Sequence, residues 1–428
     1  MKKNTLVVTV EGGGNVPPIY GFARKLMETG HVITILSEPC MRKSVKELGA
    51  SFVPYREHFL REDPKDDLFK DYNATLLKNP VFDTVMFGPA AYVIDHTIEL
   101  IKSRSIDLLV VDFLLFPAVI AAKYMKIPVV ILNHMPEILP GPNRPPGNMS
   151  LRPGHGFAFR LRDRILNKLF NLKLNEFKPK LNKIMASLSM EPLRNTSDLI
   201  YNADLKLIQT LKSFDIPIEP APKNVRYTGP VLDDPDWAAS KQWENPWPEH
   251  KDRPIVVVAF SSTFQNQTKA LQNCINALKD LPINGCVTLG PAMEDIELNC
   301  PENVIVMKSV KHSLLFPHTD LVITHGGHGT IIRALANGLP LIILPMGRDQ
   351  GDNAIKVELC NAGIKLSPKS SPGRIRKAVE QILSNSMYKQ NVQSMKKKIA
   401  SSDGLDDVLI EINDLVINSM NKNYKPEK

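Results

Sequence analysis

Residues 321–350, LVITHGGHGTIIRALANGLPLIILPMGRDQ, carry glycine, histidine and hydroxyl side chains in an order suited to holding an anion. Gly326, Gly327 and Gly329 allow positive φ and close backbone approach, and Thr330 is the candidate N-cap of a following helix. The first backbone N–H groups of a helix have no partner within it, and the helix dipole is positive at that end. We therefore expect a phosphate or another anion at this turn.

The elements that position this turn are two short apolar runs with a helix between them. Residues 321–324 and 341–345 have the composition of buried parallel strands. Gly338 and Pro340 are typical of a helix end. Arg333, expected in the first helical turn, either faces something negative or points to solvent.

The length of 428 residues exceeds what one core usually fills, so we expect two domains. The formal net charge of +8 is spread along the chain, which favours a solvated surface. Nucleic-acid readers interleave aromatic and basic residues, a pattern that is missing here, so we expect no nucleic-acid partner. Peripheral contact with a membrane surface stays open, and the oligomeric state is not predicted.

The chain contains no run that is long and apolar enough to span a bilayer, since residues 106–125 include Asp107, Asp112 and Pro117. The N-terminus does not read as a signal peptide. Five cysteines without any CxxC spacing favour reduced thiols. We expect a cytoplasmic protein.

In the first half of the chain, polar residues follow apolar runs that read as parallel strands. These runs lie at residues 5–10, 32–36, 108–111 and 129–132. The carboxyl ends of such strands meet at one edge of the sheet, where ligands bind. We therefore expect four places to converge: the loop 12–15, Ser37 with Glu38, Asp112 and His134.

The division of the chain follows from composition. Residues 1–214 form the expected N-terminal Rossmann-like domain, and residues 215–253, rich in Pro, Asp and Trp, form a linker. Residues 254–403 form a second α/β domain. Residues 404–428 contain a helix with an apolar stripe that we expect to dock on a domain face, followed by a tail.

The segments THGGHGT and ALANGLPLIILPMGRDQGDNA resemble the donor-binding signature of the UDP-glucuronosyl/glucosyl transferase family, in particular its bacterial macrolide and antibiotic branch. The segment VVDFLLF also matches, and the resemblance extends over nearly the whole chain. It implies a GT-B fold, in which two Rossmann-like domains face each other across a cleft. It also implies inverting transfer of a sugar, without metal or cofactor, from a nucleotide-sugar to the hydroxyl of a small, lipophilic acceptor.

The resemblance assigns residues of the second domain to three parts of the donor. The diphosphate is assigned to His325, Gly326, Gly327, Gly329, Thr330, Ser262 and Thr263. The sugar is assigned to Asp349, Gln350 and His328. The nucleoside is assigned to Met307, Ser309, Val310 and Arg333. An aromatic is usual at the position of Met307 and a ribose-binding carboxylate at that of Arg333, so UDP and TDP donors both stay open.

The catalytic base is where the sequence departs from the family. Asn15 stands in the place of the usual histidine, and an amide cannot accept the proton of an acceptor hydroxyl. The aspartate that usually orients this histidine matches Asp112. Asp112 then acts directly, His134 substitutes at the same sheet edge, or the protein binds without efficient transfer. We favour His134 together with Asp112.

Other ligands are disfavoured by spacing. The stretch GGGNVP, with Glu38 after the next strand, lacks the third glycine of a dinucleotide fingerprint because Pro17 occupies that place. No GxxxxGK[ST] motif occurs. The histidines of the second half fit no standard zinc spacing. They are His312, His318, His325 and His328.

Two other functions are retained. An auxiliary protein would keep the nucleotide-sugar site without turnover, and a lipid-linked or cell-wall glycosyltransferase would expose an apolar patch near the acceptor domain. Residues 136–156, rich in proline and glycine, and residues 57–80 are the expected acceptor walls. Four phenylalanines are candidates either for an apolar acceptor pocket or for plain core. They are Phe59, Phe69, Phe87 and Phe116.

Overall fold

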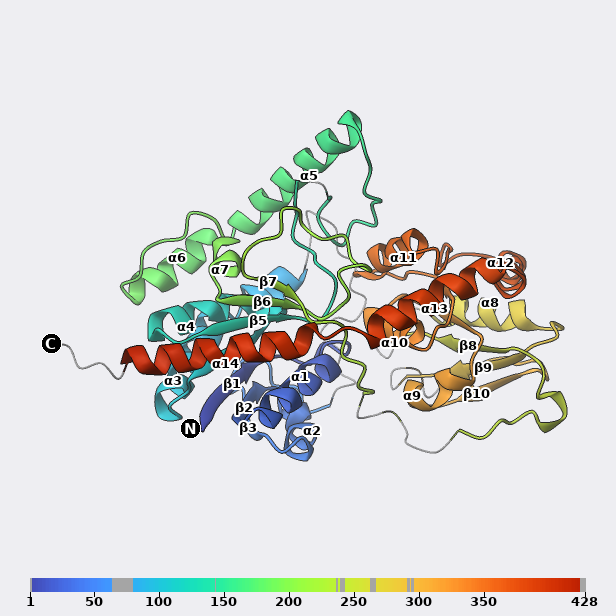
Figure 1. Cartoon of the computed structure of the whole chain (residues 1–428), viewed down its shortest axis with the longest axis horizontal. Helices are drawn as coiled ribbons and strands as arrows, with labels where there is room; N and C mark the ends of the chain where they lie inside the picture. Colours follow the sequence, from blue (N-terminus) through green and yellow to red (C-terminus); the bar gives the residue numbers. More distant parts are fainter. Residues whose placement is uncertain are drawn as a thin grey trace.

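The computed structural model describes residues 2–63, 80–142, 144–235, 238, 243–261, 267–290, 293 and 296–423. Within these residues, two parallel sheets are covered by helices on both faces (Figure 1). The first has the strand order β3-β2-β1-β4-β5-β6-β7, and the second has the order β10-β9-β8-β11-β12-β13.

The strands of the first sheet are β1 (Lys3–Val8), β2 (His31–Ser37), β3 (Ser51–Pro54), β4 (Leu108–Asp112), β5 (Val129–Asn133), β6 (Leu205–Ile208) and β7 (Val225–Tyr227). The helices between them are α1 (Val16–Glu28), α2 (Arg42–Glu47), α3 (Ala90–Ser103), α4 (Val119–Met125), α5 (Phe157–Asn175), α6 (Lys178–Ser187) and α7 (Asp198–Tyr201).

The strands of the second sheet are β8 (Ile255–Ala259), β9 (Asn284–Thr288), β10 (Val304–Met307), β11 (Leu321–Thr324), β12 (Leu341–Ile343) and β13 (Gly363–Lys365). The accompanying helices are α8 (Thr268–Leu278), α9 (His312–Leu315), α10 (His328–Ala336), α11 (Gln350–Leu359), α12 (Pro372–Ser384), α13 (Ser386–Ala400) and α14 (Gly404–Asn423). Shorter helical turns are η1 (Pro39–Met41), η2 (Phe82–Met86), η3 (Phe113–Ala118), η4 (Pro248–His250) and η6 (Phe316–His318).

Each sheet buries both of its faces, because successive side chains of a strand point to opposite sides. In β1, Leu6 and Val8 pack in the cluster with α3 and α4, whereas Val7 packs with α1 and α2. In β8, Val256 and Val258 pack with α8 and α12, whereas Val257 packs with α10 and α13. This arrangement explains why the strands read as continuous apolar runs.

The segments that join the halves also contribute to the first sheet. Residues 215–253, expected as a linker, contain the edge strand β7, which pairs with β6 in parallel. Helix α14 leaves the second half and lies across the first (Figure 1). Its Val408, Ile412 and Val416 are buried in the cluster that holds α1 and the buried side chain Val7 of β1. None of the helices in the described part of the chain is long and apolar enough to cross a membrane.

Candidate active site

The glycine turn after β11 is shaped by close backbone packing. Gly326 has φ +101°, and a Cβ there would lie 2.7 Å from Cγ2 of Ile343. Gly327, in extended conformation, is the N-cap of α10, and a Cβ on it would lie 2.7 Å from Nε2 of His325. A side chain at either position would therefore force Ile343 or the His325 ring to shift.

We expect Gly326→Ala to lower the free energy of unfolding by about 1–3 kcal/mol, because alanine avoids positive φ and its methyl group meets Ile343. Gly373→Ala is the matched control, since a Cβ at that helical position meets no atom within 4 Å. Chemical unfolding of both variants measures the difference. Equal stability of the two would show that the turn accepts a side chain.

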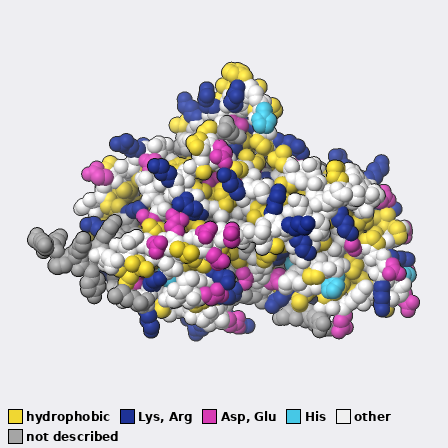
Figure 2. All heavy atoms as spheres, in the orientation of Figure 1, with side chains coloured by type: hydrophobic (Ala, Val, Ile, Leu, Met, Phe, Trp, Pro, Cys, Tyr) yellow, Lys and Arg dark blue, Asp and Glu magenta, His cyan; other side chains and the backbone are white. Residues whose placement is uncertain are grey.

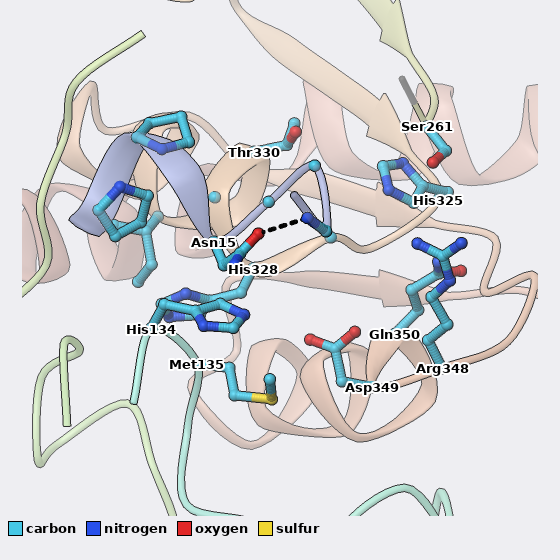
Figure 3. Close-up of a pocket in the computed structure, with 18 of the residues that line it drawn as sticks. Asn15, His134, Met135, Ser261, His325, His328, Thr330, Arg348, Asp349 and Gln350 are labelled. Carbon is cyan, nitrogen blue, oxygen red and sulfur yellow. Dashed lines mark hydrogen bonds between the residues drawn. The ribbon is translucent and has the colours of Figure 1, made fainter. Parts of the chain in front are cut away.

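The N-terminus of α10 opens into a pocket between the two halves. His328, Gly329 and Thr330 form its first turn and line this pocket, and their backbone N–H groups have no acceptor within the helix. Thr330 had been expected as the N-cap, but the structure gives that place to Gly327 and puts Thr330 inside the helix. The predicted anion site keeps its backbone donors, and Thr330 also lines the pocket (Figure 3).

His325 lies directly before this turn and lines the same pocket. Its Nδ1 is 3.3 Å from Oγ1 of Thr324, and its ring also bonds to the backbone of Ala259. Burial, reinforced by the positive charge of Arg348, lowers the pKa of His325 to about 3. The ring is therefore neutral at physiological pH and held in one orientation.

Arg348 is a pocket residue that the sequence reasoning missed. It precedes Asp349 and Gln350 in a left-handed backbone conformation, with φ +55°, and it lines the pocket on the same side as His325, with its guanidinium toward that ring (Figure 3). A guanidinium is the side chain best suited to bind a diphosphate. The signal in the sequence was a cation directly before the predicted sugar-binding pair.

The predicted sugar-binding pair stands at the start of α11. Asp349 is the N-cap, its Oδ2 accepts a bond of 2.7 Å from Nδ2 of Asn353, and its carboxylate faces the pocket (Figure 3). Gln350 also lines the pocket, but its Oε1 accepts from the backbone N–H groups of Met346 and Gly347 at 2.7 and 3.2 Å. Gln350 therefore closes the turn that presents Asp349.

Asn15 and Asp112 form a buried hydrogen-bonded unit below the turn that follows β1. The Asn15 amide donates to Oδ2 of Asp112 at 2.7 Å and to the Val10 carbonyl at 2.8 Å, and its Oδ1 accepts from Gly12 N–H at 2.9 Å. Asp112 also accepts from Thr9 Oγ1 and from Leu114 N–H, at 2.9 and 3.0 Å. Asn15 lines the pocket, whereas Asp112 is not among the lining residues.

His134 follows β5 and lines the pocket, and neither of its ring nitrogens hydrogen-bonds to another residue in the described ranges. Burial lowers the pKa of His134, while the carboxylates of Asp112 and Asp349 act in the opposite direction. No hydrogen bond joins His134 to Asp112 within the same ranges. The two predicted partners therefore interact through charge and not through a hydrogen bond.

His328 lies beside His134 (Figure 3). Its Nε2 is 3.1 Å from Oγ1 of Thr210, and its ring also bonds to the backbone of His134. Burial lowers the pKa of His328 to about 3. Its bonds cross from the second half of the chain to the first, so this neutral ring joins the halves at the pocket.

Among the predicted nucleoside residues, Val310 and Arg333 line the pocket, and Met307 and Ser309 do not. Arg333 does not point to solvent: it is 9% exposed and lies in the second half of α10 rather than in its first turn. Its guanidinium donates to the backbone carbonyls of Leu232 and Asp233 and lies 3.8 Å from Oδ1 of Asp234. Arg333 thus fixes residues 232–234, the segment that passes between α1 and α10.

His312 also lines the pocket, although the nucleoside assignment did not include it. Its ring stacks on Phe316 with centroids 4.3 Å apart, and its Nδ1 is buried without a partner among the described residues. Burial, with the positive charge of Arg333, lowers the pKa of His312 to about 3.

We expect His312→Phe to weaken the acid sensitivity of the fold. The folded protein keeps His312 neutral, whereas the unfolded chain protonates it below about pH 6.5, so stability is full above that pH and falls as pH decreases. Each such histidine contributes a slope of about 1.4 kcal/mol per pH unit. Urea unfolding between about pH 6 and pH 5 measures the slope. An identical slope in the variant would contradict the assigned pKa.

The wall of the pocket on the N-terminal side is mainly apolar. It includes Val81, Phe82, Met86, Phe113, Leu114, Met135, Ile138, Met149 and Phe170. The expected segment 136–156 contributes four lining residues, Ile138, Gly147, Asn148 and Met149. Phe59, Phe87 and Phe116 are core residues instead of lining ones. Outside the described residues lie Ser262, Thr263, Phe69 and most of the expected wall 57–80. Ser261, which directly precedes Ser262, lines the pocket.

The loop that forms this wall is tied to helix α11 of the second half of the chain. The Asp352 carboxylate accepts from the backbone N–H groups of Asn148 and Ser150 at 2.5 and 2.6 Å. Arg152 pairs with Glu358 on the same helix. The two walls of the pocket are therefore joined across the cleft. No group of three or more His, Cys, Asp or Glu arranged to hold a metal occurs within the described ranges.

Comparison with known proteins places this geometry in context. A family model described as UDP-glucoronosyl and UDP-glucosyl transferase matches residues 33–399. The chain is similar to the 4'-demethylrebeccamycin synthase of Lentzea aerocolonigenes, with 25% identity over 97% of this chain and 100% of the relative.

Solved structures resemble the chain over both halves. The glycotransferase of kitacinnamycin has a TM-score of 0.76 and 20% identity, covering 96% of this chain and 98% of that one. The glycosyltransferase VinC in complex with DTDP has a TM-score of 0.67 and 18% identity, covering 97% and 100%. The two facing parallel sheets are thus the GT-B fold, which confirms the fold that the sequence predicted.

Proposed function

Because the chain belongs to the UDP-glucoronosyl and UDP-glucosyl transferase family and is therefore a nucleotide-sugar-dependent glycosyltransferase, we propose that it performs an inverting, metal-independent transfer. The sugar moves from a UDP- or TDP-sugar to a hydroxyl of a small lipophilic acceptor. Residues 254–403 bind the donor and residues 1–214 bind the acceptor.

One observation carries the proposal: a single pocket joins an anion-binding end to an apolar end. The α10 N-terminus and Arg348 supply fixed positive charge where the diphosphate leaves. Such preorganised dipoles stabilise a leaving group that gains negative charge as its bond breaks. The apolar wall on the other side suits an acceptor with little polar surface.

The acceptor oxygen attacks the anomeric carbon while the bond from that carbon to the diphosphate oxygen breaks. The hydroxyl proton passes to a ring nitrogen of His134, and the nucleoside diphosphate carries away the bonding electrons. His134 is the proposed base because its ring lines the pocket, is neutral and has no competing hydrogen bond among the described residues. The carboxylates of Asp112 and Asp349 favour the imidazolium that forms.

A second function, nucleotide-sugar binding without efficient transfer, is favoured by the pairing of Asn15 with Asp112. That pairing occupies the carboxylate that would otherwise orient a base. One assay distinguishes the two functions. UDP- and TDP-sugars are offered with phenolic and polyketide-like acceptors, and products are identified by mass spectrometry. A glycosylated acceptor supports transfer, whereas saturable donor binding with neither product nor donor hydrolysis supports the binding function.

A further inference from the structure

Helix α5 carries an apolar stripe that faces away from the protein. Phe157, Leu161, Ile165, Leu169 and Leu172 recur at helical spacing and share one face. Their side chains are 76, 43, 51, 40 and 56% exposed, in that order. The residues of α5 that are fully buried, Asp163 and Leu174, lie on the opposite face. The stripe is therefore not the face that holds α5 to the protein.

Positive charges flank this stripe without neighbouring acids. Arg160, Arg164 and Lys168 are exposed and form no salt bridge with the described residues. The one acid of the helix, Asp163, is 2% exposed and pairs with Arg162 at 2.6 Å. Figure 2 shows hydrophobic and Lys or Arg side chains together on the part of the molecule that projects above the sheets, where α5 lies in Figure 1.

The inner side of α5 is fastened to the acceptor side of the pocket. Asn167 donates to the carbonyls of Gly141 and Arg144, at 2.7 and 3.3 Å, and Phe170 lines the pocket. A surface that binds the outer stripe would therefore lie close to the apolar wall of the pocket. This is also the region where a lipid-linked acceptor requires an exposed apolar patch.

We propose that α5 docks the protein on an anionic lipid surface, with the apolar stripe at the boundary between headgroups and acyl chains. A helix with an apolar face and flanking cations has the composition of helices that lie in that boundary. Anionic headgroups complement the three exposed cations. A second copy of the chain would instead bring like charges together over this face. The proposal does not depend on sugar transfer.

Vesicle flotation tests the docking with the full chain. Vesicles of phosphatidylcholine with phosphatidylglycerol are compared with vesicles of phosphatidylcholine alone. We expect strong binding to the anionic vesicles and release by added salt. Arg160→Gln, Arg164→Gln and Lys168→Gln together should weaken binding roughly 100-fold, since each cation near an anionic surface contributes about fivefold.

The apolar contribution is tested with Ile165→Ser and Leu169→Ser together, which should reduce binding to both kinds of vesicle. Ile410→Ser with Ile417→Ser is the matched control, because these side chains of α14 are 62 and 45% exposed. The control should bind as the native chain does, and circular dichroism should show all variants folded. Equal binding to both vesicle types by the native chain, or an equal loss in the control, would overturn the proposal. So would a dimer in sedimentation that the stripe substitutions abolish.

Discussion

His134→Ala is expected to lower kcat/KM for sugar transfer by about 10²- to 10⁴-fold, the usual contribution of a positioned general base. The His134 ring lines the pocket and has no hydrogen-bond partner among the described residues, so it is available to an acceptor hydroxyl. Its backbone, and not its ring, bonds His328. The substitution should therefore leave donor affinity within a few-fold of the native value.

The pH profile separates a base from a structural residue. The native rate should fall as pH decreases through the pKa of His134, which burial holds below the ordinary value of about 6.5. His134→Gln keeps a polar side chain of similar length. It should lower the rate of sugar transfer as much as His134→Ala does. If His134→Gln retains native rate and pH profile, His134 is not the base and Asp349 becomes the next group to test.

Lys206→Met is expected to lower the free energy of unfolding by about 3–5 kcal/mol, because it leaves a buried carboxylate without its counter-ion. Nζ of Lys206 lies 2.7 and 2.8 Å from the two carboxylate oxygens of Glu137. The side chains are 0 and 1% exposed. Glu137 begins the loop that contributes to the apolar wall of the pocket, so the pair also fixes that loop to β6. Chemical unfolding measures the loss.

The double variant Lys206→Met with Glu137→Leu is the control for this pair. Replacing both charges with apolar side chains removes the unpaired carboxylate, so the double variant should be more stable than Lys206→Met. It should stay below the native value, because the backbone N–H groups of Ile138 and Leu139 lose their acceptor on Glu137. A double variant as unstable as Lys206→Met alone would show that packing, and not the unpaired carboxylate, causes the loss.

The fold was readable from the sequence because strands buried on both faces appear as continuous apolar runs, and the turn of Gly326 and Gly327 separates two of them. The expectation of an anion site at this turn came from the same local order. Which face of helix α5 is exposed was not predictable, because the outcome depends on where the distant segments pack against it.

The sequence did not predict the positions of residues whose surroundings come from distant segments of the chain. For Arg333 the sequence left open whether the side chain faces a negative group or solvent, and the structure covers it with residues 232–234. The sequence showed Asn15 only as a residue that replaces the usual catalytic base. In the structure its amide group hydrogen-bonds both to the turn after β1 and to Asp112. Arg348 reaches the pocket from a left-handed backbone conformation. Arginine seldom adopts this conformation, so the sequence did not indicate it.

The most direct test of the proposed mechanism is the anomeric configuration of the product formed from an α-configured UDP- or TDP-sugar in the presence of a chelator. A diphosphate stabilised by the α10 N-terminus and Arg348, with attack from the acceptor side, predicts a β-glycoside in proton NMR at an undiminished rate. An α-glycoside, or loss of product when EDTA is added, would contradict inverting, metal-independent transfer in this pocket.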